Sequence, residues 1–109
     1  MDFQEYEARA IETAIYPASY AIVYPAIGAA NEAGELLGKV KKMIRDGHLD
    51  PASLHAEIGD VLWYLAALCR DLTEEYGAVY SLDGAAHNNL TKLADRAERG
   101  KLSGSGDNR

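Results

Sequence analysis

The amino-acid sequence predicts an all-α fold, an antiparallel bundle of about four helices that assembles as an oligomer. Apolar residues recur at helical spacing along most of the 109 residues, and no segment shows the polar–apolar alternation of a strand. Capping residues flank the periodic segments, with Asp50 and Ser81 at expected helix starts and Gly77 and Gly100 at expected ends. A chain of this length is enough for one domain with a modest core.

The first helix is expected from about Asp2 to Ala14. Its apolar face repeats at helical spacing through Phe3, Tyr6, Ala10 and Thr13. Residues 15–25 are expected to be a connector, because Pro17 and Pro25 disfavour helical backbone at the residues before them.

The second helix is expected from Ala26 to Arg45, followed by the short turn "DGHLD". The third helix should run from the Asp50 cap, with Pro51 at its first position, to about Tyr76. The fourth should run from the Ser81 cap to near Arg99. Residues 1–100 thus form a single helical domain, and the Gly/Ser-rich residues 101–109 form a flexible tail.

Composition limits the class of function. The formal net charge of -6 argues against a protein that coats nucleic acid. The charged start "MDFQEYEARA" is unlike a signal peptide, and no apolar run approaches the roughly 20 residues of a membrane span. The single Cys69 excludes an internal disulfide and fits a reducing compartment. We therefore expect a cytoplasmic protein that binds neither membranes nor nucleic-acid polymers.

Two pairs of acids lie at the margin of the expected core. Glu32 and Glu35 are three residues apart, as are Glu57 and Asp60, so each pair lies within about 60° on one helix face. On both helical wheels the acidic stripe borders an apolar arc, and in the third helix Tyr64 and Asp71 lie on the acidic side.

The short turn should make the second and third helices antiparallel neighbours. The Glu32/Glu35 midpoint lies roughly 18 Å before the turn and the Glu57/Asp60 midpoint roughly 11 Å after it, a mismatch of about one helical turn. Four carboxylates at one level would repel, and either raised pKa values or a bound divalent cation such as Mg²⁺ would relieve the repulsion. The alternative is an ordinary solvated face with Glu35 and Lys39 as an i,i+4 pair.

The fourth helix carries a complementary stripe. Asn89, Lys92 and Arg96 follow i, i+3, i+7 spacing beside apolar residues. Lysine and arginine at the edge of a metal site suit phosphate oxygens, whereas without such a site the stripe is an ordinary basic surface.

The ordered motifs resemble a known family. "NEAGE" and "EIGD" form E-x-x-E, a 21-residue gap and E-x-x-D, and "DVLWYLAAL", "NLTKLADR" and "GSGDNR" follow. This set, which extends from "TAIYP" to the end of the chain, resembles the MazG-like all-α nucleoside triphosphate pyrophosphohydrolases. One departure is Asn31, where many relatives have glycine before the first acid.

The resemblance implies hydrolysis of nucleoside triphosphates to monophosphate and pyrophosphate by water attack at the α-phosphorus. Mg²⁺, with Mn²⁺ as a substitute, would be held by Glu32, Glu35, Glu57 and Asp60. Glu35 or Glu32 would orient or deprotonate the attacking water. The substrate-binding candidates are Lys39, Tyr64, Asn89, Lys92 and Arg96.

Two other functions stay open at this point. One is phosphoribosyl-ATP pyrophosphohydrolase, which shares the helical acid pattern, and the other is a non-catalytic helical module that binds metal and dimerises. The nucleobase is expected against the connector, where Tyr16, Tyr20 and Tyr24 offer aromatic faces, although ordinary packing explains these tyrosines equally well.

A homodimer or homotetramer is expected, as the resemblance also implies. The third helix has a second apolar patch, formed by Trp63 and three alanines, far round from its main apolar arc. A partner subunit would cover this patch, unless the first helix of the same chain does so.

Overall fold

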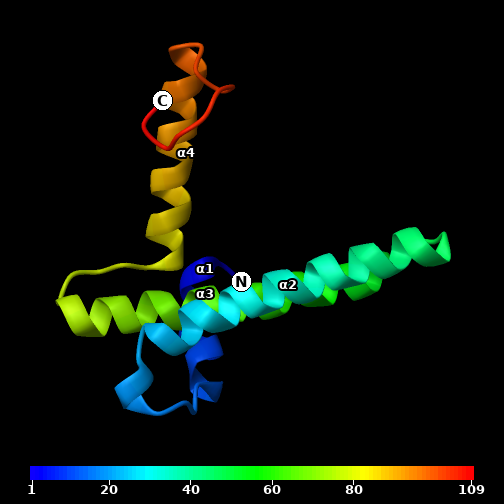
Figure 1. Cartoon of the computed structure of the whole chain (residues 1–109). Helices are drawn as coiled ribbons and strands as arrows, with labels where there is room; N and C mark the ends of the chain where they lie inside the picture. The colour runs from blue at the N-terminus through cyan, green and yellow to red at the C-terminus, as the bar shows by residue number, and fades with distance from the viewer.

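The computed structural model describes residues 1–109 and contains four α-helices and no strand (Figure 1). Short 3₁₀ turns at Ile11–Thr13 and Ala18–Tyr20 lie in the segment between the first two helices. The helices are α1 (Phe3–Ala10), α2 (Val23–Asp46), α3 (Pro51–Tyr76) and α4 (Leu82–Glu98). The predicted all-α class is confirmed. No helix combines the length and the apolar character that a bilayer crossing requires.

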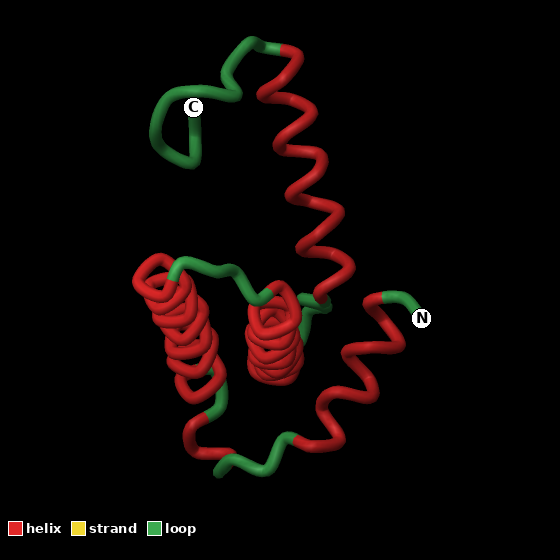
Figure 2. The backbone as a smooth tube through the Cα atoms, turned by 90° about the vertical axis from the view of Figure 1, so that its right-hand side faces the viewer, coloured by secondary structure: helices red, strands yellow, loops and turns green.

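Helices α2 and α3 form a long antiparallel hairpin, and Figure 2 shows them side by side, viewed nearly end-on. The turn at residues 47–50 is short because one of its residues ends α2 and another caps α3. Gly47 ends α2 in the left-handed conformation at φ 81°, and its N–H donates to the Met43 carbonyl at 2.9 Å. Asp50 caps α3 by accepting from the Ser53 N–H at 3.3 Å. The predicted start and end of α3 are confirmed.

The predicted start of α2 is wrong by three residues, since the helix begins at Val23 rather than Ala26. Pro25 lies inside the first turn, where backbone N–H groups have no intrahelical partner, so its missing N–H costs nothing there. Pro25 is the largest fully buried side chain of the chain. The first helix is shorter than predicted, because its last turn tightens into the 3₁₀ turn.

Helix α1 and the 3₁₀ turn after it pack against α3 at Trp63. The Trp63 indole N–H lies 3.0 Å from the Ala10 carbonyl and 2.8 Å from the Thr13 hydroxyl oxygen. Ala66 and Ala67 are only 0% and 1% exposed. Ala66 and Ala67 are therefore covered within the chain, and the first helix covers part of Trp63. Because Trp63 is only half-buried and Ala56 is exposed, contact of these two residues with a partner subunit stays a prediction.

Helix α4 leaves the hairpin and projects away from it (Figures 1 and 2). The radius of gyration is 16.6 Å, against about 13 Å for a compact domain of 100 residues. Only 8 of 109 residues are buried, so the single chain does not close a core of ordinary size. Large apolar side chains stay exposed on α2, α3 and α4, including Ile27, Leu37, Ile44, Ile58 and Leu90.

A first prediction concerns the close contact between α2 and α3 at Gly28. A Cβ at Gly28 would lie 2.1 Å from Cε1 of Tyr64, so the Gly28→Ala variant must displace that ring. We expect a loss of about 1–3 kcal/mol in the free energy of unfolding, measured by urea denaturation.

The matched control is Gly34→Ala in the same helix, where a Cβ meets nothing within 4 Å. This variant should gain roughly 0.5–1 kcal/mol through helix propensity. Equal effects of the two substitutions would show that Tyr64 does not pack on Gly28.

Candidate metal centre

Three of the predicted acids converge between α2 and α3. Carboxylate oxygens of Glu32, Glu57 and Asp60 all lie within 4.8 Å of one another. Glu57 is buried at 7% exposure, Glu32 is half-buried and Asp60 is exposed. The cluster is therefore buried at Glu57 and open to solvent at Asp60, one turn further along α3.

Glu35, the fourth predicted acid, is exposed and does not belong to this close group. It lies three residues further along α2, about 4.5 Å closer to the hairpin turn. Its charge still acts on the cluster. Partial burial, followed by the hydrogen-bonding interaction with the Glu57 side chain and then the negative charges of Asp60, Glu57 and Glu35, raises the pKa of Glu32.

Lys39 is the cation that the chain itself supplies to the cluster. Its ammonium group lies 2.8 Å from Oε1 of Glu57 and donates to the Ser53 carbonyl at 3.3 Å. The hydrogen bond from Lys39 holds the pKa of Glu57 below its usual range, and the same bond raises the pKa of Lys39. Lys39 thus pairs across the hairpin with Glu57, and the surface pair with Glu35 is not formed.

The other carboxylate oxygen of Glu57 has no partner. Oε2 is buried and accepts no hydrogen bond. A buried charged oxygen without a partner is costly, and a cation held between Glu57, Glu32 and Asp60 would remove that cost. Carboxylate oxygens are the ligands that hard divalent cations prefer. The residues present therefore fit a divalent cation.

Tyr64 connects the acid cluster to a row of aromatic rings. Burial, followed by interactions with Tyr24 and with the charges of Glu32 and Asp60, raises the pKa of Tyr64. The Tyr24 ring centroid lies 6.3 Å from that of Tyr64, and the Tyr16 ring stacks on Tyr24 at 4.7 Å. We call Tyr16, Tyr24 and Tyr64 the tyrosine row. It runs from the acids to the connector.

The basic residues of α4 lie elsewhere. Lys92 lies 2.8 Å from Oδ1 of Asp107, and Arg96 donates to the carbonyl and carboxylate of the same residue. The Lys92 hydrogen bond is the main cause that holds the pKa of Asp107 below its usual range. Helix α4 projects away from the hairpin (Figure 1), and both Lys92 and Arg96 pair with Asp107 rather than with an acid of the cluster.

Asp107, the partner of Lys92 and Arg96, was not predicted from the sequence. Residues 101–109 contain no helix or strand and fold back along the end of α4, where the Lys101 N–H donates to the Arg96 carbonyl at 2.7 Å. Arg96 is buried at 5% exposure. The available signal was a lone acid in a tail that follows a basic stripe.

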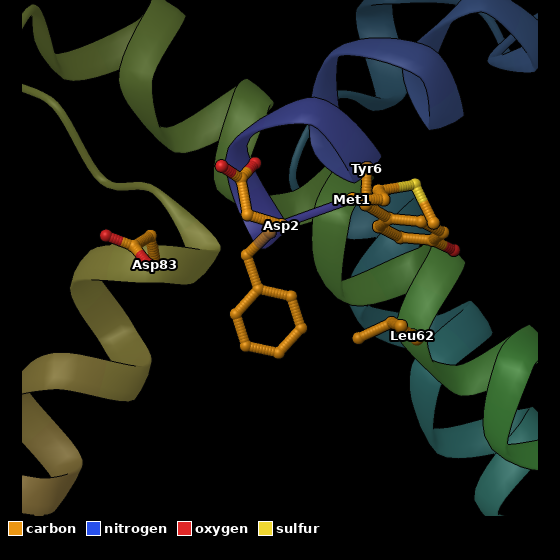
Figure 3. A pocket seen from close by; sticks show the side chains of 6 residues that line it. Met1, Asp2, Tyr6, Leu62 and Asp83 are labelled. Atoms are coloured by element: carbon orange, nitrogen blue, oxygen red, sulfur yellow. The ribbon is translucent and has the colours of Figure 1, made fainter.

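A shallow hollow of about 440 Å³ lies between α1 and the start of α4 (Figure 3). It is lined by Met1, Asp2, Phe3, Tyr6, Leu62 and Asp83. Burial, followed by the negative charge of Asp60, raises the pKa of Tyr6 on the wall of this hollow, but Glu32, Glu57 and Asp60 do not line it.

Comparison with known families decides what this arrangement belongs to. The MazG nucleotide pyrophosphohydrolase domain matches residues 27–100, well over half of the chain. The chain belongs to the MazG family. The matched range includes all four predicted acids and every predicted substrate-binding residue. The resemblance inferred from the motifs is confirmed, and it supports nucleotide pyrophosphohydrolase activity.

A relative in Mycobacterium phage L5, the "Gene 37 protein", is 39% identical over 115 residues. The similarity covers 95% of this MazG chain and 96% of the phage protein. No solved structure matches the chain.

A second prediction follows from the unpartnered oxygen of Glu57. Millimolar Mg²⁺ or Mn²⁺ should raise the thermal unfolding midpoint by several degrees, because a cation that binds only the folded state stabilises it by mass action. Differential scanning fluorimetry across a titration measures this rise.

The Glu57→Gln variant should show a smaller rise, because it removes the buried charge. The matched control is Glu98→Gln at the exposed end of α4, which should keep the full rise. An unchanged midpoint in the wild-type protein would count against a metal centre here.

Proposed function

We propose that this protein is a Mg²⁺-dependent nucleotide pyrophosphohydrolase that cleaves (d)NTP to (d)NMP and pyrophosphate by water attack at the α-phosphorus. The observation that carries the proposal is the cluster of Glu32, Glu57 and Asp60 around a buried carboxylate oxygen without a partner, in a chain of the MazG family. Mn²⁺ is the expected substitute.

The acids would hold the cation and activate the attacking water. Glu57 and Asp60 from α3 and Glu32 from α2 would hold the cation, with Glu35 one turn away as a fourth ligand. Bound there, Mg²⁺ would neutralise charge on the triphosphate and make a water molecule more acidic.

Glu35 or Glu32, whichever the cation does not fully engage, would orient and deprotonate the attacking water. Without a cation the pKa of Glu32 is raised, and a cation bound by Glu32 would lower it again. Glu57 is a poor base, because its hydrogen bond with Lys39 lowers its pKa. Exposed Glu35 has room for a water beside the cluster.

The tyrosine row would bind the nucleobase. Tyr64 lies beside the acids, and the partly exposed Tyr24 ring lies further along the row, with Tyr16 stacked behind it. A base stacked on Tyr24 would leave its triphosphate near Tyr64 and the acid cluster. Tyr20 is exposed and does not join the row, so it is the least favoured of the three connector tyrosines.

The basic stripe of α4 would reach the acids only from a second copy of the chain. Apolar residues such as Leu37 on the hairpin and Leu90 on α4 are exposed in the single chain, and packing of α4 against the hairpin of another subunit would bury them. Lys92 and Arg96 already bind a carboxylate, that of Asp107, which supports their capacity to bind phosphate oxygens. We therefore propose a homodimer or homotetramer in which Asn89, Lys92 and Arg96 complete the partner's site.

A third prediction tests the reaction. Purified protein with a panel of nucleoside triphosphates should release pyrophosphate rather than orthophosphate, and only with Mg²⁺ or Mn²⁺ present. The Asp60→Asn variant should lose at least about 100-fold in kcat, because it weakens the cation site. Metal binding without turnover on any nucleotide would indicate the non-catalytic helical module instead.

A fourth prediction tests the shared site. Lys92→Ala should cost little stability, since its ion pair with Asp107 is exposed, while kcat/KM falls sharply. Mixing the inactive Lys92→Ala and Glu57→Gln proteins should then restore about a quarter of wild-type activity, because random pairing forms one intact site in half of the dimers.

Light scattering at micromolar concentration gives the oligomeric state directly. A monomer with full activity would contradict the shared site. Full activity of Lys92→Ala with unchanged KM would remove Lys92 from it.

A further inference from the structure

A strained turn joins the connector to α2. Ile22 has φ 70° and ψ -55°, and it is the one residue other than glycine with positive φ. The Val23 N–H donates to the Ala21 carbonyl at 2.8 Å, which closes a three-residue γ-turn around Ile22. For a β-branched residue this conformation is strained, so the surrounding structure must hold it.

Asp71 on α3 is the residue that holds this turn. Its carboxylate is 3% exposed, and Oδ2 accepts from the Ile22 N–H at 3.0 Å. The same oxygen accepts from the Tyr16 hydroxyl at 2.6 Å. Arg70 donates to the other oxygen at 3.2 Å and to the Tyr16 hydroxyl at 3.1 Å. One buried carboxylate therefore fixes both the start of the connector and the start of α2.

This carboxylate also fixes the tyrosine row. Tyr16, which Asp71 holds by its hydroxyl, stacks on Tyr24, and Tyr24 follows the strained turn by two residues. Burial and the hydrogen bond to Asp71 raise the pKa of Tyr16 to about 12, so its hydroxyl stays a donor at neutral pH. Tyr24, which is 44% exposed, is thus connected to Asp71 through the Tyr16 hydroxyl and the Ile22 N–H.

We propose that Asp71 is a positioning residue for the nucleobase: through Tyr16 and the γ-turn at Ile22 it holds the Tyr24 ring where a base stacks. The inference rests on the proposed function, since it takes nucleotide as the ligand. It assigns Asp71 no contact with substrate and no part in binding the cation.

The test compares three variants with one control. Tyr16→Phe keeps the stacked ring but loses the bonds of the hydroxyl to Asp71 and Arg70. Asp71→Ala loses the bonds of the carboxylate to Tyr16, Ile22 and Arg70. We expect KM for the preferred triphosphate to rise about fivefold in Tyr16→Phe and at least about tenfold in Asp71→Ala. In both, kcat and the Mg²⁺-induced rise in unfolding midpoint should stay near wild type. Asp71→Asn keeps an acceptor for the Ile22 N–H and should recover most of the wild-type KM.

The matched control is Thr73→Val, which lies two residues further along α3. It removes the acceptor for the Tyr80 N–H at 2.9 Å and the donor to the Cys69 carbonyl at 3.0 Å, so it loses two hydrogen bonds at the same end of the hairpin. Its KM should not change. If Tyr16→Phe and Asp71→Ala lower stability but leave KM as in Thr73→Val, Asp71 is a structural clasp only and the inference is wrong.

A double variant tests the turn itself. Glycine adopts positive φ without strain, so Ile22→Gly in the Asp71→Ala background should recover part of the lost KM. Ile22→Gly alone should change KM little. No recovery in the double variant would show that the strained turn does not link Asp71 to Tyr24.

The outcomes separate the two proposals. A wild-type protein that neither hydrolyses triphosphates nor binds an α,β-methylene triphosphate analogue would overturn the proposed function and this inference with it. A wild-type protein that turns over substrate, with KM unchanged in every Asp71 and Tyr16 variant, would overturn only the inference.

Discussion

The antiparallel pairing of α2 and α3 is the constraint on which the rest of the structure depends. A turn of only residues 47–50 favours antiparallel packing of the two helices, and in that packing the acids of one helix meet those of the other. The resulting repulsion is only partly relieved by Lys39, whose single bond to Glu57 leaves the second oxygen of that carboxylate without a partner. The hairpin therefore brings together a site that is electrostatically incomplete, which is the property that suits a cation.

The two ends of the hairpin carry different groups. At the end away from the turn, the Asp71 carboxylate accepts hydrogen bonds from the Ile22 N–H, at the strained start of α2, and from the Tyr16 hydroxyl. The tyrosine row lies between this carboxylate and the acid cluster, and Lys39 lies on the side of the turn. The tyrosine row, which suits a nucleobase, and the acid cluster, which suits a cation, thus follow one another along this pair of helices. The structure lends itself to a ligand that is aromatic at one end and anionic at the other.

Several features were predictable because they depend on neighbours in the sequence. Helical periodicity and the caps at Asp50 and Gly77 determined the class and the bounds of α3. The convergence of Glu32 with Glu57 was predictable from helix rise and turn length alone. Even the wrong start of α2 has a local reason, since proline is tolerated in a first turn although it disfavours helix at the residue before it.

What the sequence by itself determined, then, is the helices, the hairpin and the acidic pairs, all of which follow from spacings of a few residues or one short turn. Only the tertiary structure decided which distant groups form hydrogen bonds and ion pairs with these elements. The partner of Trp63 is the Ala10 carbonyl and that of Ile22 is Asp71, both about fifty residues away in the chain. Lys92 turned out to bind Asp107 instead of facing the acids, because the direction of α4 is set by packing that periodicity does not encode. A helical wheel gives the face of a residue, whereas the contact across that face depends on how distant segments fold together.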